Sequence, residues 1–243
     1  MRLSIKLKTM IGNKLPVDYR SMLLSLFKSS FAANDFERKI YFDENKQENH
    51  DLRPFTFAVY LSNPKFDKEE IFLESESFTV NFSTPDFETG IMLYNGLLAG
   101  RNKLFEYKDK CKIKIETIHL NKQEKTIFKN EAVFKMLSPI VVKESDLQTN
   151  HDKFYSPADP EYFTLLNKNC AMKAEQFLNK SLSLDGIEVL DYKKIPVKLK
   201  GHFVEAYIGI FRLKGEPELL NLLYQIGLGA KNGYGFGMME VVK

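Results

Sequence analysis

The sequence has no tryptophan, only two cysteines and no long apolar run. The scarcity of cysteine and the lack of an apolar run each exclude a class of protein. With Cys111 and Cys170 as the only cysteines, the disulfide framework of a small secreted domain is excluded and a reducing compartment is favoured. No apolar stretch approaches the ~18 residues that span a bilayer, and the amino-terminal MRLSIKLKTM lacks the continuous apolar core of a signal peptide. We therefore expect a cytoplasmic protein without a membrane-spanning segment.

Histidine is also scarce, with four in 243 residues. The pairs His50–Asp51 and His151–Asp152 suggest a metal-dependent phosphohydrolase, but such a site needs several more histidines at helical spacing. No serine or cysteine lies in a recognisable nucleophile elbow. We therefore predict neither a metal ion nor a cofactor.

The net charge of +3 is too small to indicate a nucleic-acid partner, but the charge is unevenly distributed. Residues 34–94 hold 13 acidic and 6 basic residues, whereas residues 101–143 hold 11 basic and 5 acidic ones. Residues 192–243 hold 8 basic and 4 acidic residues. A chain of this kind can present a basic face to a polyanion such as RNA. The alternative, that these lysines are solvated faces of strands, stays open on charge alone.

The spacing of apolar residues predicts the elements of the first half. They follow the order strand 2–9, helix 15–31, strand 53–62, hairpin strands 71–75 and 77–83, helix 84–100 and strand 111–120. Asp18 lies at the start of the first helix, and Thr84 is a candidate cap for the second. Strand, helix, strand pair, helix and strand form the ferredoxin-like plan, which RNA recognition domains share.

The second half repeats this order more loosely. Its elements are strand 132–142, helix 159–182, hairpin 195–215, helix 216–227 and strand 235–242. Asp159 is expected to begin the helix, with Pro160 in its first turn. No low-complexity linker separates the halves. We therefore predict an α+β protein with two tandem ferredoxin-like domains, residues 1–122 and 123–243, packed side by side.

The most distinctive motif is a carboxyl-terminal segment, residues 227–237, with five glycines in eleven residues. Glycine lets backbone amides approach a ligand closely, and Lys231 and Asn232 add a cation and an amide, so the segment suits phosphate oxygens. A dinucleotide-binding motif is excluded, because the spacing is not G-x-G-x-x-G and the segment follows a helix instead of beginning one. A tight turn before an edge strand is the structural alternative.

The pattern G-x-G, five residues, G-x-G resembles the signature of the CRISPR-associated repeat-processing endoribonucleases of the RAMP superfamily. The segment 213–242 matches the family's last helix, loop and closing strand, and MLSPIVV (136–142) resembles its central strand. RPFTFAVYL (53–61) resembles the strand after the first helix, and residues 1–28 resemble the amino terminus. The resemblance covers nearly the whole chain in the expected order.

This resemblance implies a protein that binds CRISPR repeat RNA, as precursor and as mature crRNA, and cuts the precursor without a metal ion. The 2′-hydroxyl attacks the neighbouring phosphate and leaves a 2′,3′-cyclic phosphate and a 5′-hydroxyl. The implied RNA-binding residues lie in the glycine-rich segment and in a basic hairpin after Asp191. They are Gly227, Gly229, Lys231, Asn232, Gly235 and Gly237, with Lys193, Lys194, Lys198, Lys200 and His202. Subunits of a CRISPR effector complex are further expected partners, and the chain is expected to be a monomer or a homodimer.

The catalytic positions depart from the family pattern of a tyrosine, then a histidine one helix later, then a lysine. Lys28 falls near the tyrosine position, Asp43 at the histidine position and Arg53 near the lysine position. An aspartate with an ordinary pKa near ~3.9 is a poor base for a 2′-hydroxyl. Either His50 supplies an imidazole from the polar loop, or Lys28 and Arg53 act by positioning and charge, with Tyr41 as a further candidate.

Three functions therefore stay open. The first is a metal-independent endoribonuclease that matures CRISPR RNA, with His50, Lys28, Tyr41 and Arg53 as its catalytic candidates. The second is a non-cleaving repeat-binding protein of the same superfamily, favoured by the missing histidine. The third is a ferredoxin-like RNA-binding module without repeat specificity.

Overall fold

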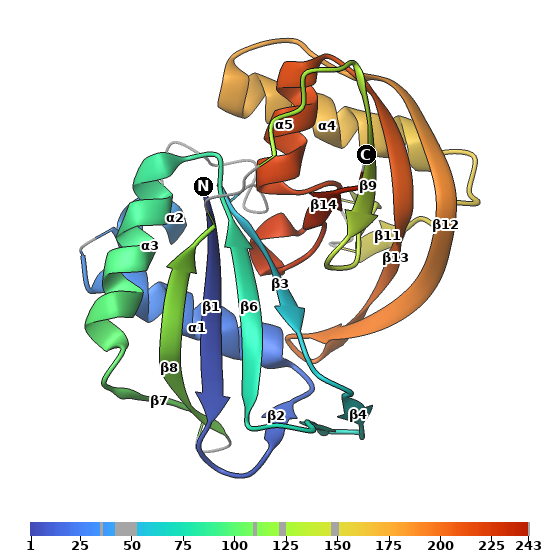
Figure 1. Cartoon of the computed structure of the whole chain (residues 1–243). Helices are drawn as coiled ribbons and strands as arrows, with labels where there is room; N and C mark the ends of the chain where they lie inside the picture. The colour runs from blue at the N-terminus through green and yellow to red at the C-terminus, as the bar shows by residue number, and fades with distance from the viewer. Residues whose placement is uncertain (35, 42–52, 109–110, 122–124, 147–150, 243) are drawn as a thin grey trace.

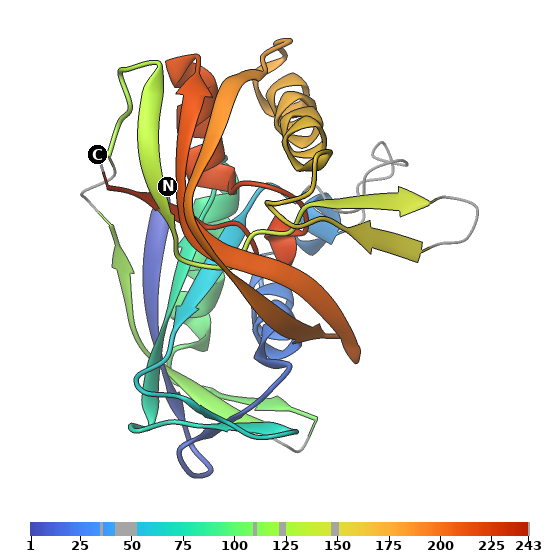
Figure 2. The same cartoon turned by 90° about the vertical axis from the view of Figure 1, so that its right-hand side faces the viewer.

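The computed structural model covers residues 1–243 and describes all of them except 35, 42–52, 109–110, 122–124, 147–150 and 243 (Figure 1). It is an α+β structure in which each half of the chain builds an antiparallel sheet with helices packed on it (Figures 1 and 2). Among the helices of the described residues, none combines the length and the apolar character needed to cross a membrane.

The sheet of the first half has the strand order β3-β6-β1-β8-β7. Its strands are β1 (Arg2–Thr9), β3 (Thr56–Tyr60), β6 (Ser77–Ser83), β7 (Leu104–Tyr107) and β8 (Cys111–Leu120). The alternation in β1 buries Leu3, Ile5 and Leu7 on one face, as the period of a strand requires. These residues join the core beneath the helices.

Helices α1 (Tyr19–Ala32), α2 (Glu37–Tyr41) and α3 (Phe87–Gly100) belong to this half. The Asp18 side chain accepts from the backbone N–H of Ser21 and caps α1, as expected. The predicted cap of α3, Thr84, is wrong, because Asp86 accepts from the N–H groups of Glu88 and Thr89. The Thr84 hydroxyl accepts from the backbone N–H of Asp86 instead, so it stabilises the turn that precedes α3.

The expected hairpin of residues 71–75 with 77–83 is also wrong. Strand β5 (Glu70–Phe72) pairs with β2 (Lys14–Pro16) and β4 (Lys65–Phe66) in a separate small sheet. The partner of β6 is β3, which sets Phe57 opposite Phe82. That pairing buries both aromatic side chains against Phe27, which a three-residue strand could not do.

The sheet of the second half has the order β12-β13-β9-β14. Its elements are β9 (Glu131–Met136), α4 (Tyr162–Leu178), β12 (Leu184–Leu199), β13 (His202–Gly215), α5 (Pro217–Ile226) and β14 (Met239–Val241). Strand β12, which follows α4, lies at one edge of this sheet, as β3 does in the first sheet. The last strand, β14, lies next to the first strand, β9, as β8 lies next to β1. The cap of α4 is Glu161 and not Asp159, whose carboxylate accepts from the N–H of Ser156.

A short hairpin of β10 (Lys143–Asp146) and β11 (His151–Phe154) was not predicted from the sequence. It lies between β9 and α4 in the chain and projects from the body of the second half (Figure 2). Its strands have four residues each and are mainly polar, so no alternation of buried side chains marks them.

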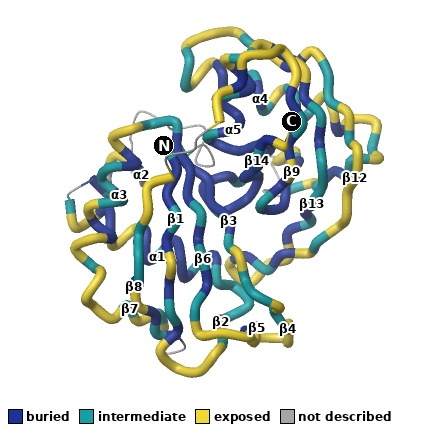
Figure 3. The backbone as a smooth tube through the Cα atoms, viewed as in Figure 1, coloured by how far each residue is buried: buried dark blue, intermediate teal, exposed yellow. Residues whose placement is uncertain are grey.

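The buried side chains form one cluster in each half and a smaller third cluster of residues from the second half. The third cluster consists of Val141, Val197, Leu199, Val204, Ala206 and Phe236. Buried backbone accordingly runs through the middle of the molecule near β14 (Figure 3). Tyr234 packs against both the first and the third cluster, so it lies where the two halves meet.

A buried arginine at the start of β1 joins the halves. One guanidinium nitrogen of Arg2 donates to Glu240 at 2.8 Å, and the other donates to the carbonyls of Tyr224 and Met239 at 2.7 Å each. The guanidinium carbon lies 3.6 Å from the centre of the Tyr224 ring. A guanidinium can be buried here because hydrogen bonds and the aromatic face compensate for lost water.

Replacing Arg2 with methionine should lower the free energy of unfolding by about 3 kcal/mol, because buried acceptors lose their donor. The matched control is Lys6→Met on the same strand, which removes an exposed ion pair to Glu116 at 3.0 Å. We expect the control to cost less than about 1 kcal/mol. Urea unfolding followed by circular dichroism measures both, and equal losses would contradict a special role for Arg2.

Candidate functional site

The glycine-rich loop, residues 227–237, connects α5 to β14 and is mostly buried. The backbone has positive φ at Gly227, Gly229, Gly235 and Gly237, and also at Lys231. The Asn232 side chain is buried and donates to the carbonyls of Leu228 (3.3 Å) and Phe236 (3.0 Å). It therefore holds the two sides of the loop together.

Close packing explains why these positions are glycine. A Cβ at Gly235 would lie 2.5 Å from the Phe57 ring, and one at Gly237 would lie 2.0 Å from the carbonyl oxygen of Leu228. The interpretation from sequence is that the glycines leave the backbone open to a ligand. In the structure this backbone also packs against the protein and Asn232 has an internal role, and contact of these residues with RNA stays a prediction.

A buried lysine lies beneath the loop. Lys173 of α4 is fully buried, and its ammonium donates to the carbonyls of Gly227 and Gly229 at 2.7 Å each. Among the residues that the structure describes, no carboxylate forms an ion pair with it. Burial lowers the pKa of Lys173 to about 8, although the Cys170 thiol one turn away opposes the shift. The loop therefore has a cation behind it that only backbone carbonyls compensate.

The first half contacts the loop through α1 and the start of β3. The Thr56 hydroxyl donates to the carbonyl of Phe236 at 2.8 Å. The guanidinium of Arg20, which is buried, lies 4.9 Å from the centre of the Phe236 ring, and its Nε lies 3.5 Å from the carbonyl oxygen of Gly235. Arg53 packs its side chain on Gly233 and lies 4.7 Å from the centre of the Tyr234 ring.

The tip of the β12–β13 hairpin reaches the same place. Lys200 at the turn donates its backbone N–H to Asp18 at 2.9 Å, and its ammonium lies 3.4 Å from the Tyr234 hydroxyl. Lys198 next to it pairs with Glu69 at 3.0 Å. The structure therefore brings together Arg53 and Lys200, for which the sequence predicts different roles.

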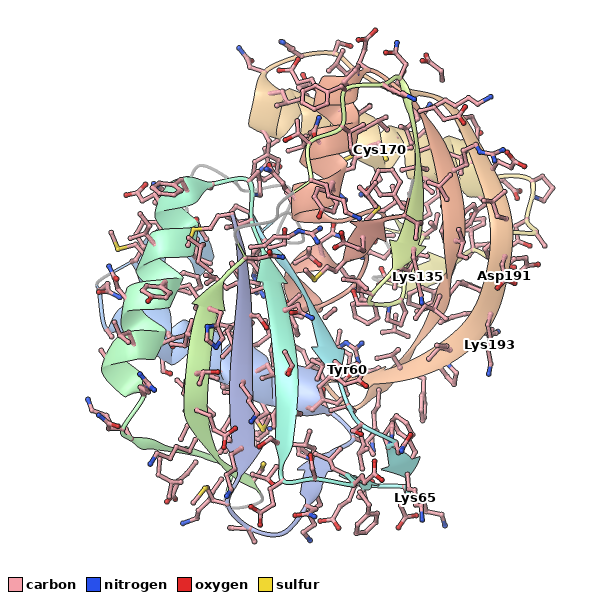
Figure 4. The ribbon with its side chains drawn as sticks, viewed as in Figure 1. Tyr60, Lys65, Lys135, Cys170, Asp191 and Lys193 are labelled. Atoms are coloured by element: carbon pink, nitrogen blue, oxygen red, sulfur yellow. The ribbon has the colours of Figure 1, made fainter. Side chains whose placement is uncertain are left out.

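The other lysines of the hairpin lie along its length. Lys194 pairs with Glu205 at 2.6 Å, and hydrogen bonding to that carboxylate raises the pKa of the lysine. Lys193 and His202 are exposed, and Lys193 points away from the body of the molecule (Figure 4). The side chains of Lys193, Lys194 and His202 are therefore at the surface, but they do not join Arg53 and Lys200 at the glycine-rich loop.

Lys231 of the loop is held by a carboxylate. Its ammonium lies 3.1 Å from Asp152, which also accepts from Lys143 at 3.0 Å and from Ser145 at 2.8 Å. Burial alone would raise the pKa of Asp152, but the hydrogen bonds and the charge of Lys231 lower it. Two lysines share one carboxylate here, at the base of the β10–β11 hairpin.

The remaining catalytic candidates are placed differently. Lys28 of α1 pairs with Glu37 at 3.0 Å. His50 lies outside the described residues, and Tyr41 ends α2 but its side chain is also outside the described part of the chain. Among the four candidates, the structure associates Arg53 with the glycine-rich loop.

Three residues at the loop were not predicted from the sequence: Arg20, Lys173 and Tyr234. A signal for Lys173 was present, because it shares the helical spacing of the buried Leu166 and Cys170 and therefore falls on the core face of α4. Nothing local marked Arg20 or Tyr234, because Arg20 contacts Gly235 from the other half and Tyr234 meets Arg53 and Lys200 from two other segments.

Within the described part of the chain, no three histidine, cysteine, aspartate or glutamate side chains gather in a way that could hold a metal ion. The charged side chains that contact the loop from other elements are mainly cations, namely Arg20, Arg53, Lys173 and Lys200, and Asp152 pairs with Lys231 of the loop. Such an arrangement suits a phosphate-bearing ligand at its surface.

The chain is similar to known proteins over its whole length. The family model described as "CRISPR associated protein Cas6, C-terminal" matches residues 120–241. The "CRISPR-associated endoribonuclease Cas6" of Pyrococcus furiosus is 25% identical over 233 residues, covering 94% of this chain and 84% of the relative. An "endoribonuclease-like protein Cas6" of the same organism is 24% identical over an alignment that covers 100% of this chain and 99% of the relative. A solved structure described as "An RAMP protein binding different RNA substrates" superimposes with a TM-score of 0.83 at 21% identity, covering 100% of each chain.

The burial of Lys173 makes stability depend on pH. In the folded protein the ammonium loses its proton near pH 8, whereas the unfolded chain keeps it to about 10.5. Between these values unfolding takes up a proton, so the free energy of unfolding of the wild type should rise relative to Lys173→Met, by up to about 1.4 kcal/mol per pH unit. Urea unfolding from pH 7 to 10.5 measures the difference. A difference that does not change with pH would show that Lys173 titrates normally.

Alanine at Gly235 should destabilise the protein by about 2–4 kcal/mol, because the new methyl group meets the Phe57 ring in addition to adopting a positive φ. Gly201 is the matched control, since its φ of +85° is like the +81° of Gly235 but nothing lies within 4 Å of the position that a Cβ would take. We expect Gly201→Ala to cost only the backbone strain of about 1 kcal/mol. Thermal unfolding of the two variants compares them, and equal costs would mean that the loop yields to the methyl group.

Proposed function

This chain belongs to the Cas6 family of CRISPR-associated proteins, and on that basis we propose that it binds CRISPR repeat RNA and cuts the precursor transcript without a metal ion. The proposal is supported by a relative named as an endoribonuclease and by a fold like that of an RNA-binding RAMP protein. The observation that carries it is the meeting of Arg53 from the first half with Lys200 from the second, at the glycine-rich loop.

The halves, residues 1–122 and 123–243, are on this proposal tandem ferredoxin-like domains lying side by side. Support comes from the strand order: apart from the additional edge strand β7, β3-β6-β1-β8 in the first sheet corresponds to β12-β13-β9-β14 in the second. The loop, Arg20 and Arg53 then lie at the boundary between the domains. A substrate that crosses this boundary would meet groups from both.

The proposed reaction is attack of the 2′-hydroxyl on the adjacent phosphate. This breaks the bond to the 5′ oxygen and leaves a 2′,3′-cyclic phosphate. Negative charge builds up on the phosphate oxygens in the transition state, and a cation aimed at them accelerates the step. Arg53 suits this role, because its planar guanidinium can bind two phosphate oxygens. Lys28, Tyr41 and His50 remain candidates for the proton transfers.

The lysines of the β12–β13 hairpin are proposed to bind the phosphate backbone of the repeat. Lys194 is exposed and Lys198 is half-buried, and both are proposed to exchange their carboxylate partners for phosphates; Lys193 points away from the body of the molecule (Figure 4). Contacts of this type release counterions, so the affinity should fall steeply as salt rises. Lys231 is proposed to join them once phosphate competes with Asp152.

A non-cleaving repeat-binding protein is the second candidate function. It is favoured by Asp43 at the position where many family members carry histidine, and by a full-length relative named as endoribonuclease-like. This alternative uses the same loop and hairpin. It differs only in the absence of strand cleavage.

The test is to incubate the protein with its repeat RNA in EDTA and to analyse the ends of the product. We expect one cut with a 2′,3′-cyclic phosphate end, slowed by ~10²–10³-fold in Arg53→Met, because a cation for the transition state is lost. Arg101→Met is the control, since Arg101 lies at the end of α3 and donates to the carbonyl of Glu116. His50→Ala in the same assay shows whether that histidine transfers a proton.

Three results distinguish the candidates. Cleavage that depends on Arg53 and not on Arg101 supports the endoribonuclease. Tight, repeat-specific binding without a cut supports the non-cleaving protein. Failure to prefer the repeat over unrelated RNA of equal length overturns both.

A further inference from the structure

Tyr234 is the residue on which two cations converge. The guanidinium carbon of Arg53 lies 4.7 Å from the centre of its ring, and the ammonium of Lys200 lies 4.9 Å from it. The same ammonium lies 3.4 Å from the phenol oxygen and donates to it. These three side chains come from the segment before β3, from the turn between β12 and β13, and from the glycine-rich loop.

The backbone around the three side chains is held firmly. Gly233 has no Cβ, which leaves the space that Arg53 occupies, and the guanidinium lies 3.5 Å from its carbonyl oxygen. Lys200 has a positive φ of 51°, and its N–H is bound by Asp18, the cap of α1. The Tyr234 ring packs on the cores of both halves while the residue keeps some exposure. Such a group is positioned before a substrate arrives.

Packing accounts for the ring of Tyr234 but not for its hydroxyl. A phenylalanine would fill the same space and accept the same two cations over its face. The hydroxyl accepts a hydrogen bond from the Lys200 ammonium, so its own hydrogen is available to a further acceptor. A phenol that loses this hydrogen becomes an anion, and two cations stand beside it to stabilise that anion.

We propose that Tyr234 is the proton donor to the leaving oxygen of the RNA, while Arg53 and Lys200 hold the phosphate that is cut. This inference rests on the proposed endoribonuclease function and assigns a residue to it. The bond between the 2′ oxygen and phosphorus forms, and the bond between phosphorus and the 5′ oxygen breaks. The 2′-hydroxyl proton leaves to a base or to water, and the 5′ oxygen takes the proton of Tyr234. Water then returns a proton to the phenolate, and no oxidation or reduction occurs.

The test compares Tyr234→Phe with the wild type on two repeat RNAs. One RNA is unmodified, and the other carries sulfur in place of the 5′ bridging oxygen at the cut site. A thiolate leaves without being protonated, so a proton donor does not accelerate its departure. We expect Tyr234→Phe to cut the unmodified RNA ~10²-fold or more slowly than the wild type and to cut the sulfur RNA as fast as the wild type.

Tyr60→Phe is the matched control, because it also removes one phenol hydroxyl. Tyr60 ends β3 with 67% of its surface exposed (Figure 4). It should cut both RNAs at the wild-type rate. The RNA affinity and the unfolding midpoint of Tyr234→Phe, measured alongside, should match those of the wild type.

The outcomes separate this inference from the function on which it rests. Equal rates of Tyr234→Phe and wild type on unmodified RNA overturn the inference and leave the endoribonuclease standing. A Tyr234→Phe variant that is equally slow on both RNAs, or that binds RNA weakly, assigns the hydroxyl another role and overturns the inference too. A wild type that cuts neither RNA overturns both proposals.

Discussion

The packing of the glycine-rich loop between the two halves is the contact on which the rest of the structure depends. Backbone carbonyls of an irregular segment cannot be buried without donors. Lys173 provides them from the second half, and Thr56 and Arg20 provide them from the first. Because Gly235 and Gly237 have no Cβ, the loop backbone can approach the Phe57 ring and the carbonyl of Leu228. The two halves are joined through this packed loop.

The same requirement explains the charge of the region. Arginine and lysine side chains donate to the buried carbonyls of the loop. Lys173 forms no ion pair with a carboxylate among the described residues, so its charge is not neutralised there. Positive charge therefore collects at the junction as a consequence of how the loop is held. Arg53 and Lys200 extend it to the surface at Tyr234. A junction built in this way attracts a polyanion, so the support of the loop and the proposed RNA binding share one physical origin.

The sequence predicted most elements because their signals are local. Alternation identified β1 and β8, and the acidic residue before α1 marked its first turn. Besides the missed β10–β11 hairpin, the errors concern choices between neighbouring segments or side chains. The pairing of β6 with β3, and not with the segment just before it, depends on Phe57 meeting Phe82 across the sheet. The cap of α3 moved by two residues because two hydroxyl or carboxyl side chains competed for the same turn.

By itself, the sequence determined most of the strands and helices and their order, and its carboxyl-terminal motif indicated the family. The tertiary structure decided how the glycines of the loop pack: they let the backbone approach its neighbours closely, and Asn232 holds the two sides of the loop together. It also decided that Arg53, Lys200 and Tyr234 meet. The reason is that periodicity and turn chemistry act over a few residues, whereas these three side chains are brought together by the packing of two sheets whose sequences lie far apart.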